Sequence, residues 1–113
     1  MIYLVSRHPG ALQWLLDLGI EPTAVITHWQ DDYKFTPNSC VIGNLPLDLI
    51  ASLSGNNIRY LHINVTIPKR LRGHELTANE LRKLGAHLQE FTVFSGNRIN
   101  SGDEINAVYG LCH

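Results

Sequence analysis

Cysteine is scarce in this sequence, which contains only Cys40 and Cys112 among its 113 residues. Two thiols so far apart cannot form a disulfide framework or a zinc site of four thiolates. Long apolar runs are lacking as well, because none approaches the roughly 18 residues that a membrane span needs. Met1 leads into a short apolar run and not into a signal peptide, so we expect a cytoplasmic protein with no membrane partner.

Charge of either sign is also sparse. Charged residues make up 17% of the chain, whereas roughly 25% is usual in soluble domains. The net charge of −1 gives no broad positive field, which argues against long DNA or RNA as a partner. A short anionic ligand stays open, because a few arginines in one pocket do not show in the total charge.

What the sequence does contain is an alternation of short apolar runs with helical patterns, at a length that fits one domain. Residues 2–5 are apolar and typical of a buried strand. Pro9 fits the first turn of a helix whose apolar residues recur at helical spacing until Gly19. Residues 23–27 form the next expected strand, so the start of the chain predicts a parallel, right-handed βαβ unit.

The alternation resumes after a loop of turn formers, charges and aromatics at residues 28–39. Three elements are expected next: a strand at 40–42, a short helix at 47–53 and a strand at 58–65. Thr77 and Glu80 have the spacing of a capping box, which opens a further helix. That helix is expected to keep one apolar face formed by Leu81, Leu84, Leu88 and Phe91.

From Thr92 onward the composition turns to Ser, Gly, Asn and Asp. We expect residues 1–91 to form one domain and residues 92–113 a C-terminal extension, with either an edge strand at 105–109 or partial mobility. The element order predicts an α/β fold: a Rossmann-like, mostly parallel sheet of about four or five strands flanked by helices. In such sheets, ligands bind beyond the carboxyl ends of the strands.

Polar side chains collect at those strand ends. In chain order, the residues that follow the four expected parallel strands are Ser6, Arg7, His8, His28, Trp29, Asn44, Lys69, Arg70 and Arg72. The last three belong to residues 69–72, which we call the basic segment. A nearly neutral protein therefore places much of its positive charge along one rim of the sheet.

Phosphate is the ligand chemistry that this rim suits best. Arginine donates two parallel hydrogen bonds to phosphate oxygens, lysine supplies a point charge, and backbone amides at the helix starts add a favourable dipole. The basic segment alone is equally well explained as a solvated loop. Arg7 favours the interpretation as a ligand pocket, because a guanidinium directly after a buried strand has better access to the sheet edge than to bulk water.

Other site chemistries find less support in the sequence. The first loop is not a G-x-G-x-x-G motif, there is no P-loop signature, and Ser6 does not lie in a G-x-S-x-G elbow. The histidine spacings match no metal motif, so we expect no cofactor and no required metal. His8 and His28 are better placed for proton transfer, whereas His62, inside an expected strand, is more typical of a core or edge histidine.

Four blocks of the sequence are distinctive and occur in this order: VSRHPGALQWL, GNLP, RYLHINV and RGHELTANELRKLGAHL. Together they resemble a family of small CRISPR-associated accessory proteins, the Csx-sixteen type, over roughly residues 2–91. The resemblance implies a ring nuclease of type III CRISPR immunity, which linearises cyclic tetra-adenylate and so switches the response off. It also implies a relation to the CARF-type binders of this messenger, which are dimers with Rossmann-like sheets.

The chemistry we expect for such an enzyme needs no metal. A ribose 2′-hydroxyl attacks the neighbouring phosphate, which leaves a 2′,3′-cyclic phosphate and a free 5′-hydroxyl. The protein must align the sugar and neutralise developing charge. On this hypothesis Ser6, Arg7 and His8 are catalytic: Arg7, helped by the basic segment, stabilises the phosphate, His8 protonates the leaving oxygen, and Ser6 positions the phosphate.

The other polar residues of the rim are expected to bind the ligand: His28, Trp29, Asn44, Lys69, Arg70 and Arg72. Either Trp29 or Tyr33 is a candidate for stacking on adenine. Because a ring of four nucleotides has a twofold axis, we expect a homodimer around it.

Two other readings stay open from the sequence. A non-catalytic binder that sequesters or senses the messenger would use the same arginines without turnover. An interaction module that docks on another CRISPR protein would ignore nucleotides altogether, and the low charge fraction is compatible with it.

Overall fold

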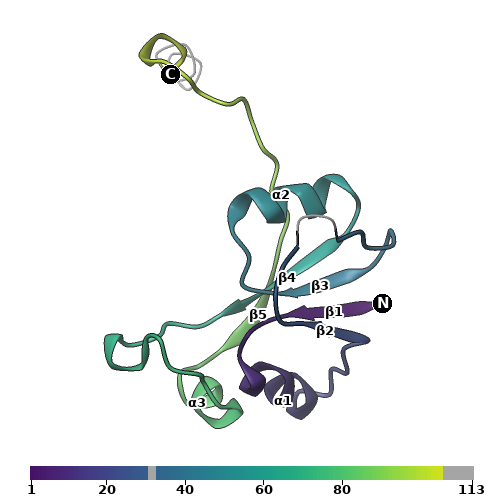
Figure 1. The fold of residues 1–113 in the computed structure, drawn as a ribbon, viewed down its shortest axis with the longest axis vertical. Helices are drawn as coiled ribbons and strands as arrows, with labels where there is room; N and C mark the ends of the chain where they lie inside the picture. The colour runs from purple at the N-terminus through teal and green to yellow at the C-terminus, as the bar shows by residue number, and fades with distance from the viewer. Residues whose placement is uncertain (31–32, 106–113) are drawn as a thin grey trace.

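The computed structural model describes residues 1–30 and 33–105. In those ranges it contains one five-stranded sheet of order β2-β1-β3-β4-β5 (Figure 1). The strands are β1 (Ile2–Val5), β2 (Ala24–Ile26), β3 (Cys40–Gly43), β4 (Arg59–Asn64) and β5 (His87–Phe91). The first four run parallel and β5 pairs antiparallel with β4, which confirms the predicted mostly parallel α/β sheet.

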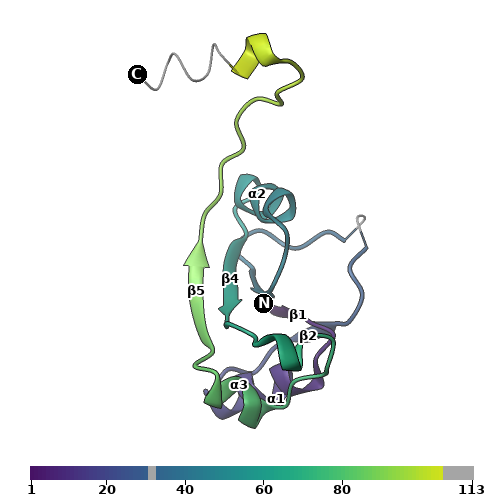
Figure 2. The ribbon, with the colours of Figure 1, turned by 90° about the vertical axis from the view of Figure 1, so that its left-hand side faces the viewer.

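Helices cover both faces of the sheet. Helices α1 (Pro9–Asp17) and α3 (Ala78–Lys83) pack together on one face, and α2 (Leu47–Gly55) covers the other, as Figures 1 and 2 show. A short 3₁₀ turn, η1 (Lys69–Leu71), follows β4. This three-layer arrangement explains why the central strands are apolar at successive positions, because parallel strands with helices on both sides are buried on both faces.

Alternate residues of the strands feed two separate cores. The core under α1 and α3 consists of Leu4, Ala11, Trp14, Leu15, Ile42, Ile63, Leu76 and Leu81. The core under α2 consists of Val41, Ile50, Leu53, Ile58 and Tyr60. The adjacent residues Val41 and Ile42 thus belong to opposite faces, as the period of two in a strand requires.

The prediction that one helix runs through Leu88 and Phe91 is wrong, because α3 ends at Lys83. Gly85 follows in the left-handed region at φ 76°, and its N–H donates to the carbonyl of Arg82. The Ala86 N–H donates to the carbonyl of Leu81, which completes a Schellman motif. Beyond this stop the chain reverses into β5.

The predicted capping box is confirmed, since the side chains of Thr77 and Glu80 each accept from the other's backbone N–H.

Residues after β5 lead away from the body of the molecule (Figures 1 and 2). The radius of gyration is 16.9 Å, against about 13 Å for a compact chain of this length. Phe94 in this extension is 85% exposed. Ile105 lies in a helical turn, and residues 106–109 of the alternative edge strand fall outside the described ranges. No helix among the described residues has the length and apolar character that crossing a membrane requires.

Candidate functional site

A cavity of about 400 Å³ lies at the carboxyl ends of the parallel strands, and we call it the strand-end cavity. Its polar wall comes from the loops after three strands: Ser6, Arg7 and His8 after β1, Trp29 after β2, and Asn44 after β3. Its apolar wall includes Ile63 at the end of β4, with Ile67, Leu76 and Leu81 beyond it. The cavity therefore occupies the position where sheets of this architecture bind ligands.

The structure brings five of the nine sequence-predicted site residues to this wall and leaves four outside it. Those on the wall are Ser6, Arg7, His8, Trp29 and Asn44. His28, Lys69, Arg70 and Arg72 are exposed and do not line the cavity. The reason lies in the loop after β4, which places apolar side chains against the cavity at Ile67 and again at Leu76 and leaves the basic segment between them facing water.

Hydrogen bonds hold residues 6–8, which we call the 6–8 turn, in one shape. The backbone N–H of His8 donates to Ser6 Oγ at 3.1 Å. The backbone N–H of Leu76 donates to His8 Nδ1 at 3.3 Å. Because Nδ1 accepts, the proton of a neutral His8 ring lies on Nε2, and Nε2 is the nitrogen that remains for a ligand.

Gly10 explains how the chain reaches this contact. A Cβ at this position would lie 2.7 Å from the Thr77 Cα and would also overlap the carbonyl oxygen of Leu76. The first turn of α1 therefore touches the backbone that precedes α3, and only glycine leaves room for that approach. The same approach brings His8 within hydrogen-bond distance of the Leu76 amide.

Arg7 is the cationic side chain of the cavity wall, and it is exposed. The two ion pairs found within the described ranges lie elsewhere: Arg59 with Glu90 at 2.7 Å, and Arg82 with Asp17 at 2.9 Å. Among the residues that the structure describes, Arg7 thus has no carboxylate partner. A guanidinium without a counter-charge at a cavity mouth can bind an anionic ligand without first breaking an ion pair.

A buried hydrogen-bond chain supports the cavity wall at Leu45, and the sequence analysis missed it. The backbone N–H of Leu45, a cavity residue, donates to Tyr60 Oη at 2.9 Å. Tyr60 is 1% exposed, and its hydroxyl lies 2.7 Å from His62 Nδ1. The hydroxyl donates to His62 Nδ1 when the neutral imidazole carries its proton on Nε2. A tyrosine on a core-facing strand position, whose hydroxyl must find partners, was the signal available in the sequence.

Burial favours the neutral forms of the two titratable groups in this hydrogen-bond chain, Tyr60 and His62. It raises the pKa of the Tyr60 hydroxyl above its ordinary value, and the hydrogen bond from Leu45 opposes the rise in part. Burial also lowers the pKa of His62 below 6.5. Both shifts favour the neutral forms, and only a neutral His62 can accept the tyrosine proton at Nδ1.

Among the described residues, no cysteine, aspartate or glutamate lines the cavity. Cys40 is a partly buried free thiol in β3 whose pKa is raised, chiefly by burial. Within residues 1–30 and 33–105, no three His, Cys, Asp or Glu side chains come close enough together to hold a metal ion. The polar groups that a ligand can meet in the cavity are therefore hydroxyl, guanidinium, imidazole, indole and amide.

An open sheet with a cavity at the carboxyl ends of its parallel strands defines the class of this protein, a small α/β protein of Rossmann-like architecture. The chain belongs to a CRISPR-associated family, because residues 3–94 match the family model described as "Putative CRISPR-associated protein (Cas_VVA1548)". This match confirms the CRISPR association implied by the resemblance. No curated protein and no solved structure matches the chain.

Proposed function

We propose that this protein is a metal-independent ring nuclease that binds cyclic tetra-adenylate and cleaves it to linear products with 2′,3′-cyclic phosphate ends. The observation that carries the proposal is the meeting of Ser6, Arg7 and His8 on one wall of the strand-end cavity. Membership in a CRISPR-associated family and the resemblance to the Csx-sixteen type support the choice of ligand. In type III systems such an activity would switch off signalling.

The polar wall suits a phosphodiester. Arg7 offers paired donors and a full positive charge, which matches the oxygens of a phosphate. Ser6 Oγ accepts from the His8 amide, so its own proton is available to a phosphate oxygen. The first turn of α1, beginning at Pro9, adds its positive dipole end beside the same wall.

In the reaction, the ribose 2′-oxygen forms a bond to phosphorus while the bond from phosphorus to the 5′-oxygen breaks. The 2′-hydroxyl gives its proton to water and the departing 5′-oxygen gains one. We assign the second proton to Nε2 of His8, which the contact of Nδ1 with the Leu76 amide leaves for the ligand. For this transfer Nδ1 takes a proton from water and gives up its hydrogen bond with Leu76, so the ring is neutral again once Nε2 has protonated the leaving oxygen. Arg7 stabilises the additional negative charge on the pentavalent phosphate.

The size of the cavity supports a homodimer. About 400 Å³ lies at the small end of the roughly 300–1,000 Å³ typical of ligand pockets. Such a volume suits one nucleotide step better than a ring of four. Two copies related by a twofold axis would place two 6–8 turns around one ring. Light scattering that finds a monomer with and without cyclic tetra-adenylate would contradict this arrangement.

Lys69, Arg70 and Arg72 have a secondary role in this proposal. They are exposed and lie outside the cavity wall, so we assign them to attraction of the anionic ring and not to the chemical step. His28, which is also exposed and outside the wall, has the same secondary place. Asn44 lies on the wall and donates to the carbonyl of Ile63 at 3.5 Å, which leaves its amide oxygen for a ribose hydroxyl.

The decisive experiment is a product assay under multiple-turnover conditions. Excess cyclic tetra-adenylate is incubated with a small amount of protein in EDTA, and the products are separated by chromatography and identified by mass spectrometry. We expect linear products carrying a 2′,3′-cyclic phosphate. An intact ring at stoichiometric occupancy would instead identify a binder, and absence of binding at micromolar protein would favour a protein-docking module. Cleavage that EDTA abolishes and manganese restores would overturn the metal-independent mechanism.

A further inference from the structure

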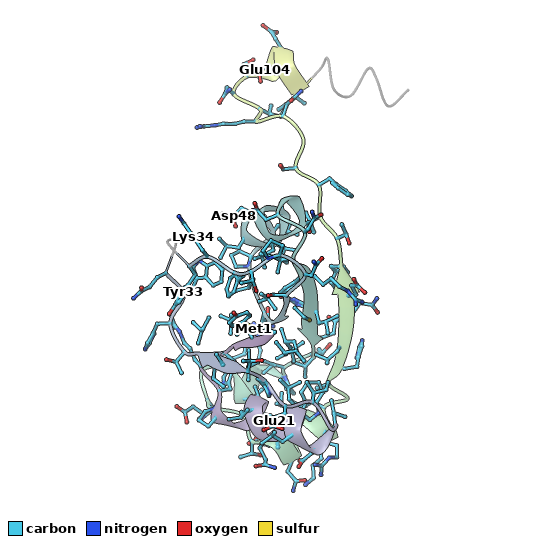
Figure 3. All side chains as sticks on the ribbon, turned by 90° about the vertical axis from the view of Figure 1, so that its right-hand side faces the viewer. Met1, Glu21, Tyr33, Lys34, Asp48 and Glu104 are labelled. Carbon is cyan, nitrogen blue, oxygen red and sulfur yellow. The ribbon has the colours of Figure 1, made fainter. Side chains whose placement is uncertain are left out.

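A second hollow, of about 510 Å³, lies on the α2 side of the sheet, and we call it the aromatic hollow. One wall comes from the loop between β2 and β3, the other from α2. The residues that matter for its chemistry are Trp29, Tyr33, Lys34, Phe35, Ser52 and Asn56. Figure 3 labels Tyr33 and Lys34 on the loop, on the same side of the molecule as Asp48 of α2.

The aromatic side chains present ring faces held by their neighbours. The rings of Tyr33 and Phe35 are nearly parallel, with 18° between their planes and 6.2 Å between centroids. Trp29 lies 5.9 Å from Phe35 at 35°. Phe35 is anchored to the sheet by an edge-to-face contact with Tyr3 of β1 at 4.7 Å. A flat aromatic ligand is the chemistry that such a set of faces binds best.

Trp29 lies in the walls of both cavities. Its Nε1 is buried, and it has no hydrogen-bond partner among the residues that the structure describes. A buried N–H without an acceptor is destabilising, so the indole is a donor that an incoming ligand can satisfy. Trp29 is thus the side chain that a ligand spanning the two cavities would contact on both sides.

Polar groups at the edge of the hollow add recognition to stacking. The Asn56 amide nitrogen donates to the carbonyl of Ser52 at 2.7 Å, which fixes the side chain and leaves Oδ1 as an acceptor. An asparagine amide oxygen pairs well with the exocyclic amino group of adenine. The cation of Lys34 lines the same hollow, where it can attract a phosphate at its mouth.

We propose that the aromatic hollow is the purine subsite of the same ligand, with an adenine ring among the loop aromatics and its phosphate across Trp29 in the strand-end cavity. This inference rests on the proposed function for the identity of the nucleotide. It assigns base recognition to Trp29, Phe35 and Asn56, separately from the phosphate chemistry of the 6–8 turn. A base and its phosphate lie on opposite sides of one ribose, which matches two cavities that share one side chain.

The test uses the indole N–H signals of the two tryptophans in a ¹H–¹⁵N spectrum of the full-length protein. Trp29→Phe assigns the Trp29 signal, and buried Trp14 serves as the internal reference. Adenosine 5′-monophosphate and cyclic tetra-adenylate are titrated separately, with inorganic phosphate and uridine 5′-monophosphate as comparisons. We expect both adenine ligands to shift the Trp29 signal, with weaker effects from the other two.

Asn56→Ala provides the affinity test, and Asn100→Ala in the exposed extension is its matched control. Loss of one hydrogen bond to the base should weaken binding of both adenine ligands about five- to tenfold, and Asn100→Ala should leave binding unchanged. Because the spectra are recorded on folded protein, a failure of Asn56→Ala to fold would be visible and the wild-type titration would still decide.

The outcomes separate this inference from the proposed function. The first outcome is that cyclic tetra-adenylate binds tightly, the Trp29 signal does not move, and Asn56→Ala binds the ligand as well as wild type does. This outcome would overturn the purine subsite and leave the ring nuclease proposal standing. No binding of the cyclic ligand, with adenosine monophosphate still shifting Trp29 in an Asn56-dependent way, would overturn the proposed function and keep a purine site. If neither cyclic tetra-adenylate nor adenosine monophosphate binds, both the purine subsite and the proposed function are overturned.

Discussion

The two polar segments that follow β1 and β4 differ in how the fold holds them. The 6–8 turn is tied to its own serine and to the Leu76 amide, and all three of its side chains line the strand-end cavity. The basic segment carries more positive charge, yet its cationic side chains are exposed and lie outside the cavity wall. We therefore expect position relative to the strand ends, and not the amount of charge, to decide which segment meets a bound ligand.

This difference also bears on catalysis. A charge stabilises a transition state most when its position is fixed before the reaction, because no reorganisation is then required. A cation that lies outside the cavity acts on a bound phosphate only from a distance, where solvent and salt screen it. We therefore expect the two segments to respond to substitution in opposite ways, with the chemical step sensitive to the 6–8 turn and ligand capture sensitive to the basic segment.

The largest effect is expected from Arg7→Ala. On the proposed function, loss of this guanidinium should reduce the rate of cyclic tetra-adenylate cleavage about 100- to 1,000-fold, as removal of a single transition-state donor commonly does. Single-turnover rates measured by chromatography of labelled ring provide the test.

Arg70→Ala is the matched control for Arg7→Ala, since it removes the same side chain from the basic segment. It should change the single-turnover rate less than about threefold and should weaken binding mainly at low salt. Equal losses in the two variants would contradict the contrast between the segments. Full activity in both Arg7→Ala and His8→Ala would remove the site assignment even if the ring is cleaved.

The next largest effect is expected from Gly10→Ala, which tests the anchoring of the 6–8 turn. The added methyl overlaps the backbone at Leu76 and Thr77, so α1 and the start of α3 must separate. Overpacking of this kind costs about 1–3 kcal/mol. Urea denaturation followed by circular dichroism should show the lower stability. Gly55→Ala, at a position with open space around it, is the control and should be nearly neutral.

Much of the fold could be predicted from short-range patterns. Strands β1 to β4, α1, α2 and the capping box of α3 each carry a local signal of apolar runs, spacing or caps, and the structure contains them. Residues up to Phe91 were assigned wrongly to the helix of α3, and His87–Phe91 form β5 instead. Leu84 and Leu88 are four residues apart, a spacing that fits both a helix and a strand, and Gly85 was the competing signal that should have ended the helix.

The candidate site was only partly predictable, for a physical reason. Parallel strands and the rule on their carboxyl ends were enough to bring Ser6, Arg7 and Asn44 to one edge. Side-chain direction in a long loop depends on contacts distant in sequence, so the exposure of the basic segment had no local signal. The contact of the Tyr60 hydroxyl with Leu45, in the loop after β3, was hidden from the sequence for the same reason.

A smaller effect is expected from Tyr60→Phe, which leaves the 6–8 turn intact and releases the cavity wall at Leu45. The substitution keeps the buried ring and removes the acceptor of the Leu45 N–H and the donor to His62. Leaving such a buried group without a partner costs about 1–2 kcal/mol. Thermal unfolding should show the loss of stability. Tyr3→Phe, whose hydroxyl makes an exposed contact with Met1, is the control and should differ little from wild type.

The smallest effect is a pH dependence from His62. Burial lowers the pKa of this imidazole in the folded protein below its ordinary value of 6.5, so the unfolded chain binds more protons as the pH falls through that value. The contribution to the free energy of unfolding is therefore complete above pH 6.5 and declines below it. His62→Asn keeps an acceptor near the Tyr60 hydroxyl but cannot titrate in this range. Between pH 7.5 and 5, wild type should lose more stability than His62→Asn in urea denaturation, and the other histidines, common to both proteins, cancel in the difference. Parallel pH curves would show that His62 is as accessible to protons in the folded protein as in the unfolded chain. They would also show that the support of Leu45 by Tyr60 does not depend on the titration of His62. A steeper decline in wild type would show instead that this support depends on the neutral form of the His62 ring.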